Sequence, residues 1–150
     1  MKKDNCTIDP ELLHCCLYFT ANTLARVITV MAEEEFRTTG ISPTHAFLVM
    51  LVNGQPGITP KELSGKLHLA PSTVTRLVDL VEARGLVRRE SEGRTMLVYP
   101  TDSGKKLQAA ILQSWESLHT RYSRALGQKQ GDRLTQMLDE AAKKLGGIRD

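Results

Sequence analysis

Four residues in the middle of the chain carry side chains that can donate hydrogen bonds, and their spacing places them on one side of a helix. They are Ser72, Thr75 and Arg76, with Thr73 beside them, and Asp79 shares the spacing of this face. Hydroxyl groups and a guanidinium can donate to phosphate oxygens and to the base edges of a DNA major groove. The set therefore predicts a surface that contacts DNA.

The helix that would present these side chains has a second, apolar face. It starts at Pro71, and Gly85 is placed to end it in the left-handed conformation. The apolar positions follow the i, i+3, i+4, i+7 spacing of one helical stripe. They are Val74, Leu77, Val78 and Val81. Burying this stripe turns the polar face outward.

A shorter helix comes just before it. Thr59 and Glu62 form a capping box around Pro60, which suits the first helical position. Leu63 and Leu67 are one turn apart and would face inward. Residues 68–70 are enough for a turn, so the segment predicts a helix-turn-helix.

A two-stranded hairpin is predicted next. Residues 86–89 and 96–99 have strand composition, and residues 90–95 form the predicted loop between them. Gly93 supplies the freedom to turn, and Arg94 projects at the tip, where it could enter a minor groove. Arg88, on the first strand, joins the predicted DNA contacts.

The order of helix, turn, helix and hairpin resembles the MarR family of winged helix-turn-helix transcriptional regulators. The resemblance is carried by STVTRLVDLVEARGLVRR, the Arg-tipped loop and YPTDSGKKL, and it extends over nearly the whole chain. It implies a mainly α fold with a small β wing. It also implies a single domain, with a DNA-binding region at 42–101 between dimerisation helices at 9–37 and 102–146. The family usually has Asp-Arg at the wing tip, whereas this chain has Gly93-Arg94.

The two flanking regions support dimerisation. A helix capped by Asp9 is predicted to run to about Arg37, and it is apolar on more than one face near its start. After the wing, a long helix is predicted to break between Gly127 and Gly131, with Asp132 capping the last helix. Their apolar stripes favour a homodimer over a monomeric core. Two-fold symmetry would then place two recognition helices roughly 34–36 Å apart on a pseudo-palindromic operator.

The segment between the first helix and the helix-turn-helix contains one further predicted helix. Ser42 and Pro43 start it, residues 53–57 form a loop by composition, and Ile58 is the candidate for a short strand that adds to the wing.

Two kinds of regulatory input follow from the resemblance. The family commonly releases DNA when a small, often aromatic, molecule binds between the dimerisation helices and the winged domain. The candidate lining residues are His14, Tyr18, Trp115 and His119. The alternative for each is an ordinary place in the core or at its rim. No residue pattern typical of an anion-binding site is visible in the sequence.

The second input is redox, because one branch of the family senses hydroperoxides through a cysteine in the first helix. Cys15 and Cys16 are the candidates, and inert thiols buried at a dimer interface are the alternative. Three cysteines clustered at one end do not form a disulfide framework.

Composition limits the other function classes. The formal net charge is +3, and residues 61–106 hold 9 basic and 6 acidic side chains, so the whole excess lies on the predicted DNA-binding segment. The four histidines are scattered, and no metal set, phosphate loop or nucleophile elbow is present. We therefore expect no cofactor and no enzyme. No membrane span or signal peptide is visible, which predicts a cytoplasmic location. The rival of another class is a winged-helix module for protein–protein contact.

Overall fold

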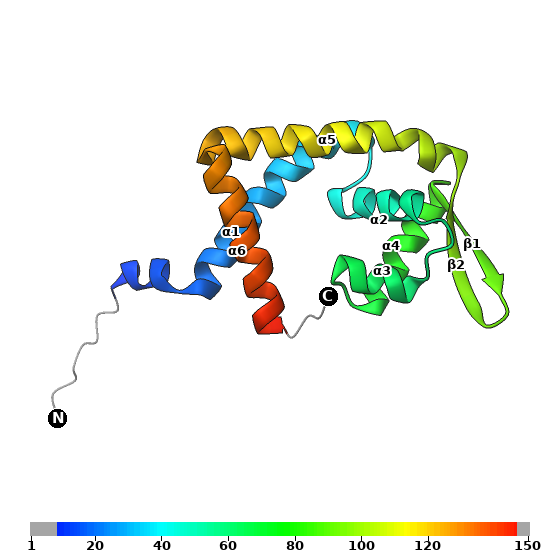
Figure 1. Ribbon diagram of the computed structural model, residues 1–150, viewed down its shortest axis with the longest axis horizontal. Helices are drawn as coiled ribbons and strands as arrows, with labels where there is room; N and C mark the ends of the chain where they lie inside the picture. The colour runs from blue at the N-terminus through cyan, green and yellow to red at the C-terminus, as the bar shows by residue number, and fades with distance from the viewer. Residues whose placement is uncertain (1–8, 147–150) are drawn as a thin grey trace, which may run out of the picture.

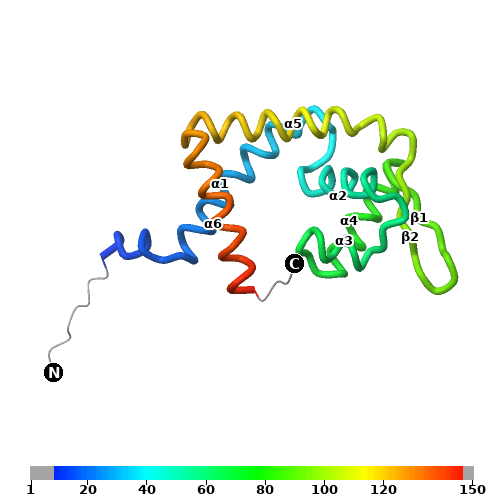
Figure 2. Tube along the Cα trace, viewed as in Figure 1, coloured from blue at the N-terminus to red at the C-terminus, as the bar shows by residue number. Residues whose placement is uncertain are grey.

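The computed structural model describes residues 9–146. A winged lobe (residues 36–100) and a pair of helical arms (residues 10–35 and 128–146) are joined by one long helix, residues 102–126 (Figure 1). The elements in chain order are η1 (Pro10–Cys15, a 3-10 helix), α1 (Leu17–Glu35), η2 (Phe36–Thr39, also 3-10), α2 (Pro43–Gly54), α3 (Pro60–Leu67), α4 (Pro71–Ala83), β1 (Val87–Glu92), β2 (Thr95–Pro100), α5 (Asp102–Leu126) and α6 (Gln128–Gly146). Figure 2 shows that α5 runs from the wing back across the molecule to the arms. The predicted fold class is confirmed.

The helix-turn-helix forms as predicted. The Thr59 hydroxyl accepts from the Glu62 N–H at 3.2 Å, and the Glu62 carboxylate accepts from the Thr59 N–H at 2.8 Å, which completes the capping box of α3. His68 adopts a left-handed φ of 52° at the end of α3, and α4 begins at Pro71. Gly85 follows α4 with a φ of 70°. These local signals mark where both helices begin and end.

The wing departs from its predicted boundaries. The strands pair through Glu92 and Thr95, so only Gly93 and Arg94 remain in the turn, rather than residues 90–95. Gly93 has a φ of 61°, which a two-residue hairpin of this kind requires at its first central position. The predicted bridge from Ile58 is confirmed, because it pairs with Val98.

The first predicted helix is broken. Asp9 caps as expected, but only the 3-10 helix η1 follows, and Cys16 is extended (φ −95°, ψ 118°) before α1 starts. The prediction of one continuous helix over 9–37 is therefore wrong at both ends, since Phe36 begins a further 3-10 turn. The apolar composition of this segment did not reveal the extended residue between η1 and α1.

Two smaller boundaries also differ. Asn53 and Gly54 belong to α2, not to a loop, and the Asn53 amide donates to the Gly104 carbonyl (3.0 Å) and the Gln108 Oε1 (2.8 Å). The turn between α5 and α6 is confined to Gly127, so Asp132 lies inside α6 and caps nothing. At Asn53 the helix continues through residues with loop-like composition, and these tertiary hydrogen bonds hold it there.

The core belongs to the lobe and to the adjoining part of α5. All fourteen buried hydrophobic residues of the described chain lie between Phe36 and Ile111. Thr101 caps α5, and its hydroxyl accepts from the Gly104 N–H at 3.1 Å. A Cβ at Gly104 would lie 2.0 Å from the Leu86 carbonyl oxygen, so only glycine allows α5 to start this close to the wing. Among residues 9–146, no helix is both long and apolar enough to span a lipid bilayer.

Candidate nucleic-acid interface

Helix α4 has the orientation that its sequence predicts. Val74, Val78 and Val81 are fully buried, while the polar set is exposed. The exposed set is Ser72, Thr73, Thr75 and Arg76. The Thr75 hydroxyl donates to the Pro71 carbonyl at 3.0 Å within the helix, which leaves its oxygen as an acceptor. The predicted DNA-contacting face is therefore open to solvent; its role in contacting DNA stays a prediction.

The wing presents Arg94 at the turn, where its side chain is exposed. Arg88 is also exposed, but it is engaged within the wing, where it forms an ion pair with Glu90 and lies 4.8 Å from the centroid of the Tyr99 ring. Of the two predicted wing contacts, Arg94 is therefore the freer to reach a partner. Arg88 would have to leave or share its present contacts.

A third arginine, which the sequence did not single out, connects the wing to the helix. Arg89 donates from Nη2 to Asp79 Oδ1 (2.5 Å) and from Nη1 to Glu82 Oε2 (2.6 Å), and Nη2 also approaches the Thr75 carbonyl at 3.4 Å. The Arg89 backbone N–H donates to the other oxygen of Glu82 at 2.9 Å. Four hydrogen bonds thus join β1 to two turns of α4.

The electrostatic balance at Arg89 favours its charged form. Burial lowers the pKa of its guanidinium, but the hydrogen bonds and charges of Asp79 and Glu82 outweigh burial and raise the pKa above its ordinary value. The guanidinium is therefore held as a permanent cation between two carboxylates. The two acids lie on α4, ten and seven residues before Arg89, and no helical or strand spacing would have revealed the pairing.

The four candidate effector residues do not converge in the protomer. His14 packs edge-on against Phe19, and Trp115 packs edge-on against Phe47. Tyr18 is 79% exposed at the start of α1. His119 lies near Asp132, with 3.6 Å between its Nε2 and a carboxylate oxygen. They lie in two groups, His14 and Tyr18 on η1 and at the start of α1, and Trp115 and His119 one turn apart on α5.

The structure instead gathers basic groups in a hollow of about 340 Å³ between η2, the start of α2 and the end of α4. Its lining includes Arg37, His45 and Arg84, and no acidic residue. Burial and the nearby Arg84 charge lower the pKa of His45, which favours the neutral ring. Arg84 also donates to the Gly40 carbonyl. Because the two arginines come from distant segments, the sequence showed no anion-binding pattern.

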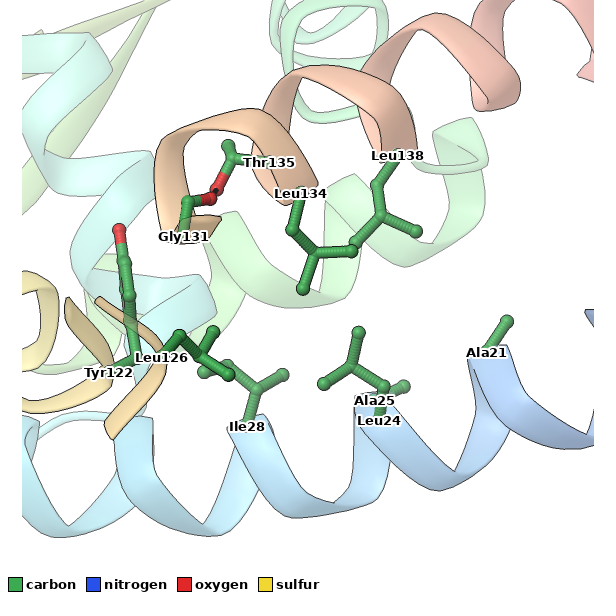
Figure 3. A pocket seen from close by; sticks show the side chains of 10 residues that line it. All are labelled: Ala21, Leu24, Ala25, Ile28, Tyr122, Leu126, Gly131, Leu134, Thr135 and Leu138. Atoms are coloured by element: carbon green, nitrogen blue, oxygen red, sulfur yellow. Dashed lines mark hydrogen bonds between the residues drawn. The ribbon is translucent and has the colours of Figure 1, made fainter. Parts of the chain in front are cut away.

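The second notable cavity is apolar and lies between the arms. Figure 3 shows side chains of α1 and α6 pointing toward each other, with Tyr122 and Leu126 from the end of α5 beside them. The hollow that they line has a volume of about 300 Å³. Its lining residues are Ala21, Leu24, Ala25, Ile28, Tyr122, Leu126, Gly131, Leu134, Thr135 and Leu138. No residue of α1 is buried, and Gly131 is the one buried residue of α6. The arms therefore leave their apolar stripes largely uncovered.

The two candidate redox residues are both accessible. Cys15 ends η1 and Cys16 is the extended residue after it, and both are exposed free cysteines. The prediction that they lie within a continuous helix is wrong, and in the protomer neither thiol is buried.

Comparison with known proteins agrees with this arrangement. Residues 39–95 match the model described as the MarR family, a span that covers α2 to the wing. The sequence has no significant match among curated proteins.

Solved structures resemble the chain over most of its length. CouR from Rhodococcus jostii RHA1 bound to p-coumaroyl-CoA is 23% identical, covers 87% of this chain and 92% of its own, and has a TM-score of 0.72. A MarR-family regulator from Listeria monocytogenes complexed with 26mer DNA is 17% identical, with 87% and 89% coverage and a TM-score of 0.72. The S. aureus MepR–DNA complex is 16% identical, with 86% and 98% coverage and a TM-score of 0.75. At these identities the likeness establishes the fold.

Proposed function

Since the chain carries the winged helix-turn-helix of the MarR family, we propose that it is a sequence-specific, DNA-binding transcriptional regulator that acts as a homodimer. The single observation that supports this most is the orientation of α4. One rotation of the helix buries Val74, Val78 and Val81 and exposes Ser72, Thr75 and Arg76. Solved structures with this fold have been obtained with DNA, including that of MepR.

The division of labour follows from the geometry. We assign α4 to the major groove, where Arg76 can make a bidentate contact to a base and Ser72, Thr73 and Thr75 can contact bases or phosphates. Arg94 at the wing tip is assigned to the neighbouring minor groove, and Arg88 to the phosphate backbone beside it. The positive excess of residues 61–106 suits this assignment.

The homodimer is supported by the uncovered arms. Exposed large apolar side chains gather on η1, α1 and α6, and they include Leu12, Leu13, Leu17, Tyr18, Val27, Val30, Met137 and Leu138. A protein in water does not keep surfaces of this extent open. We propose that helices of a second copy cover the apolar hollow between α1 and α6 and complete the arms.

The proposed regulatory input is a small molecule, and repression is the proposed output. CouR binds p-coumaroyl-CoA, which combines an aromatic group with phosphates. The basic hollow at Arg37, His45 and Arg84 could take anionic groups of such an effector, because no carboxylate lines it. It lies where the arms join the lobe, so an occupant there could change the spacing of the two recognition helices. The four originally predicted residues would contribute only if the second copy brings them together.

The test is footprinting of the purified protein on the DNA just upstream of its own reading frame, over a series of salt concentrations. A regulator should protect a pseudo-palindromic site, and its affinity should fall steeply with salt. Arg76→Ala should weaken the specific site by about 1–3 kcal/mol, and Arg94→Ala should weaken all sites and reduce the salt slope by about one. A protein-interaction module would show neither effect.

A thiol input is a second candidate, favoured by the exposure of Cys15 and Cys16. Peroxide treatment should then lower DNA affinity in the wild type, and a double Cys15→Ser, Cys16→Ser variant should keep its affinity under the same treatment. Equal affinity of the wild type before and after oxidation would remove this candidate.

A further inference from the structure

The arginine pair at positions 88 and 89 has two different roles, and the structure separates them. Both residues lie on β1 beside the proposed DNA-binding face, so either could be taken for a phosphate contact. Arg88 faces solvent, with about half of its side chain exposed, whereas Arg89 is 23% exposed and faces α4. Arg89 therefore adds little to the exposed DNA-facing surface, and its contacts to α4 need another explanation.

From this geometry we propose that Arg89 is a positioning residue, which fixes the wing to the recognition helix so that both can enter adjacent grooves together. The inference rests on the proposed DNA binding and identifies the contact that positions the wing relative to α4. Asp79 and Glu82 are the two anchors on α4, and the guanidinium bridges them in a planar fork. Such a fork fixes orientation as well as distance.

The need for a brace follows from how the wing is attached. The hairpin is two-stranded, and its outer half, from Glu90 to Met96, is exposed. An isolated two-stranded hairpin is only marginally stable in water. Arg89 lies at the boundary between the buried base of the wing and this exposed half, and its bonds to α4 hold the strand where the core stops. The position of Arg94 relative to Arg76 therefore depends on Arg89.

The brace also solves an electrostatic problem. Asp79 lies on the exposed side of α4, one turn after Thr75 and Arg76, and its side chain is 58% exposed. An uncompensated carboxylate there would repel approaching phosphates. Because Arg89 donates to this carboxylate at 2.5 Å, the acid is neutralised at short range. The helix can then approach DNA without the penalty of a free negative charge.

A double-mutant cycle on DNA binding tests the proposal. Arg89→Met keeps the aliphatic stem and removes the donors, and Asp79→Asn removes one anchor. Each single variant should lower affinity for the specific site at least about fivefold, and the double variant should be little worse than either, because coupled members of one network are not additive. Arg26→Met, on α1, is the matched control for losing one positive charge, and it should bind as the wild type does.

The salt slope separates bracing from direct contact. Arg89→Met should leave the slope of log affinity against log salt unchanged, since no phosphate contact is lost. A slope reduced by about one, with additive effects in the cycle, would show that Arg89 itself contacts DNA and would overturn the proposal.

A purely stabilising role predicts a third result. In that case Arg89→Met would lower the thermal midpoint, but the folded protein would keep its ratio of specific to non-specific affinity, and the proposal would again be wrong. Bracing predicts a fall in that ratio, measured well below the midpoint on protein of confirmed native secondary structure. If the wild type itself bound no DNA, the proposed function would fail, and that outcome is distinct from all of these.

Discussion

The winged lobe and the helical arms both have apolar stripes in the sequence, yet only the stripes of the lobe are largely buried. In the lobe, the stripes of α2, α3 and α4 meet one another and β2, and they form most of a closed core. In the arms, α1 and α6 bury no apolar side chain. An amphipathic pattern therefore indicates that a helix face must be covered. It does not indicate whether the same chain or a second copy covers it.

The largest expected effect is a loss of dimer affinity from a substitution in the arms, which leaves the lobe unchanged. Leu138→Glu places a charge on the apolar hollow, where the side chain is 40% exposed in a single protomer. In the protomer the change is tolerable, but in a homodimer it would bury an unpaired charge at a cost of several kcal/mol. We expect the dimer dissociation constant to rise by at least about 100-fold, as measured by sedimentation.

The matched control is Gln136→Glu, which adds the same charge on the opposite side of α6. It should leave the dimer intact. If Leu138→Glu sedimented as the wild type does, the hollow would not be the interface, and the contrast between lobe and arms would need another explanation.

The next effect compares the stability lost when a leucine is shortened in the lobe and in the arms. Leu63 is fully buried on α3, whereas Leu145 on α6 is 77% exposed. Leu63→Ala should lower the free energy of unfolding by about 2–5 kcal/mol, because it leaves a cavity in the core. Leu145→Ala should change it by less than about 0.5 kcal/mol if that leucine also stays exposed in the dimer. Urea unfolding at one fixed protein concentration measures both, since a dimer's stability depends on concentration.

A larger loss at Leu145→Ala would carry its own information. It would place the end of α6 inside the interface and extend the covered face by two turns beyond Leu138. A loss at Leu63→Ala below about 1 kcal/mol would contradict the picture of a tightly packed lobe.

The same contrast explains what the sequence could and could not predict. Thr59, Glu62 and Gly85 act on neighbours a few residues away, so their spacing was sufficient to place both helices of the helix-turn-helix. The Arg89 contact to Asp79 depends on how β1 lies across α4, which no local pattern records. The basic hollow at Arg37 and Arg84 was missed for the same reason.

The errors in the arms have a related physical cause. Cys16 lies in a run of apolar residues, which gave no sign that the chain is extended there between η1 and α1. Asp132 resembles a cap by composition, but α6 already starts at Gln128, directly after Gly127 turns the chain. Local signals are decisive where local bonds dominate, and they lose their value where tertiary or intermolecular contacts decide.

A smaller effect tests the local bonds themselves. Thr59→Ala removes the hydroxyl that accepts the Glu62 N–H at the start of α3. Loss of such a cap should lower the free energy of unfolding by about 1 kcal/mol. Thr101→Ala at the start of α5 is the natural comparison, because its hydroxyl accepts from Gly104 and also donates to the Gly85 carbonyl. Thermal unfolding should rank Thr101→Ala as the more damaging of the two.

The smallest effect concerns the charge of the capping box and is visible only through pH. Hydrogen bonds from the Thr59 N–H and hydroxyl lower the pKa of Glu62 below its ordinary value. The carboxylate is thus favoured in the folded state, and its contribution is fully present above the ordinary pKa of about 4.3. It is lost as the pH falls through the lowered, folded-state pKa. Glu62→Gln keeps an acceptor for the Thr59 N–H and removes the charge.

The stability difference between wild type and Glu62→Gln should therefore be constant from pH 7 to about pH 5 and should shrink below about pH 4.3. Chemical unfolding at a series of pH values, with the dimer held at one concentration, measures it. A difference that grew as the pH fell would mean that the folded state prefers the protonated carboxyl. In that case the box would be held by the threonine hydroxyl alone, and α3 would depend on packing in the lobe rather than on its own cap.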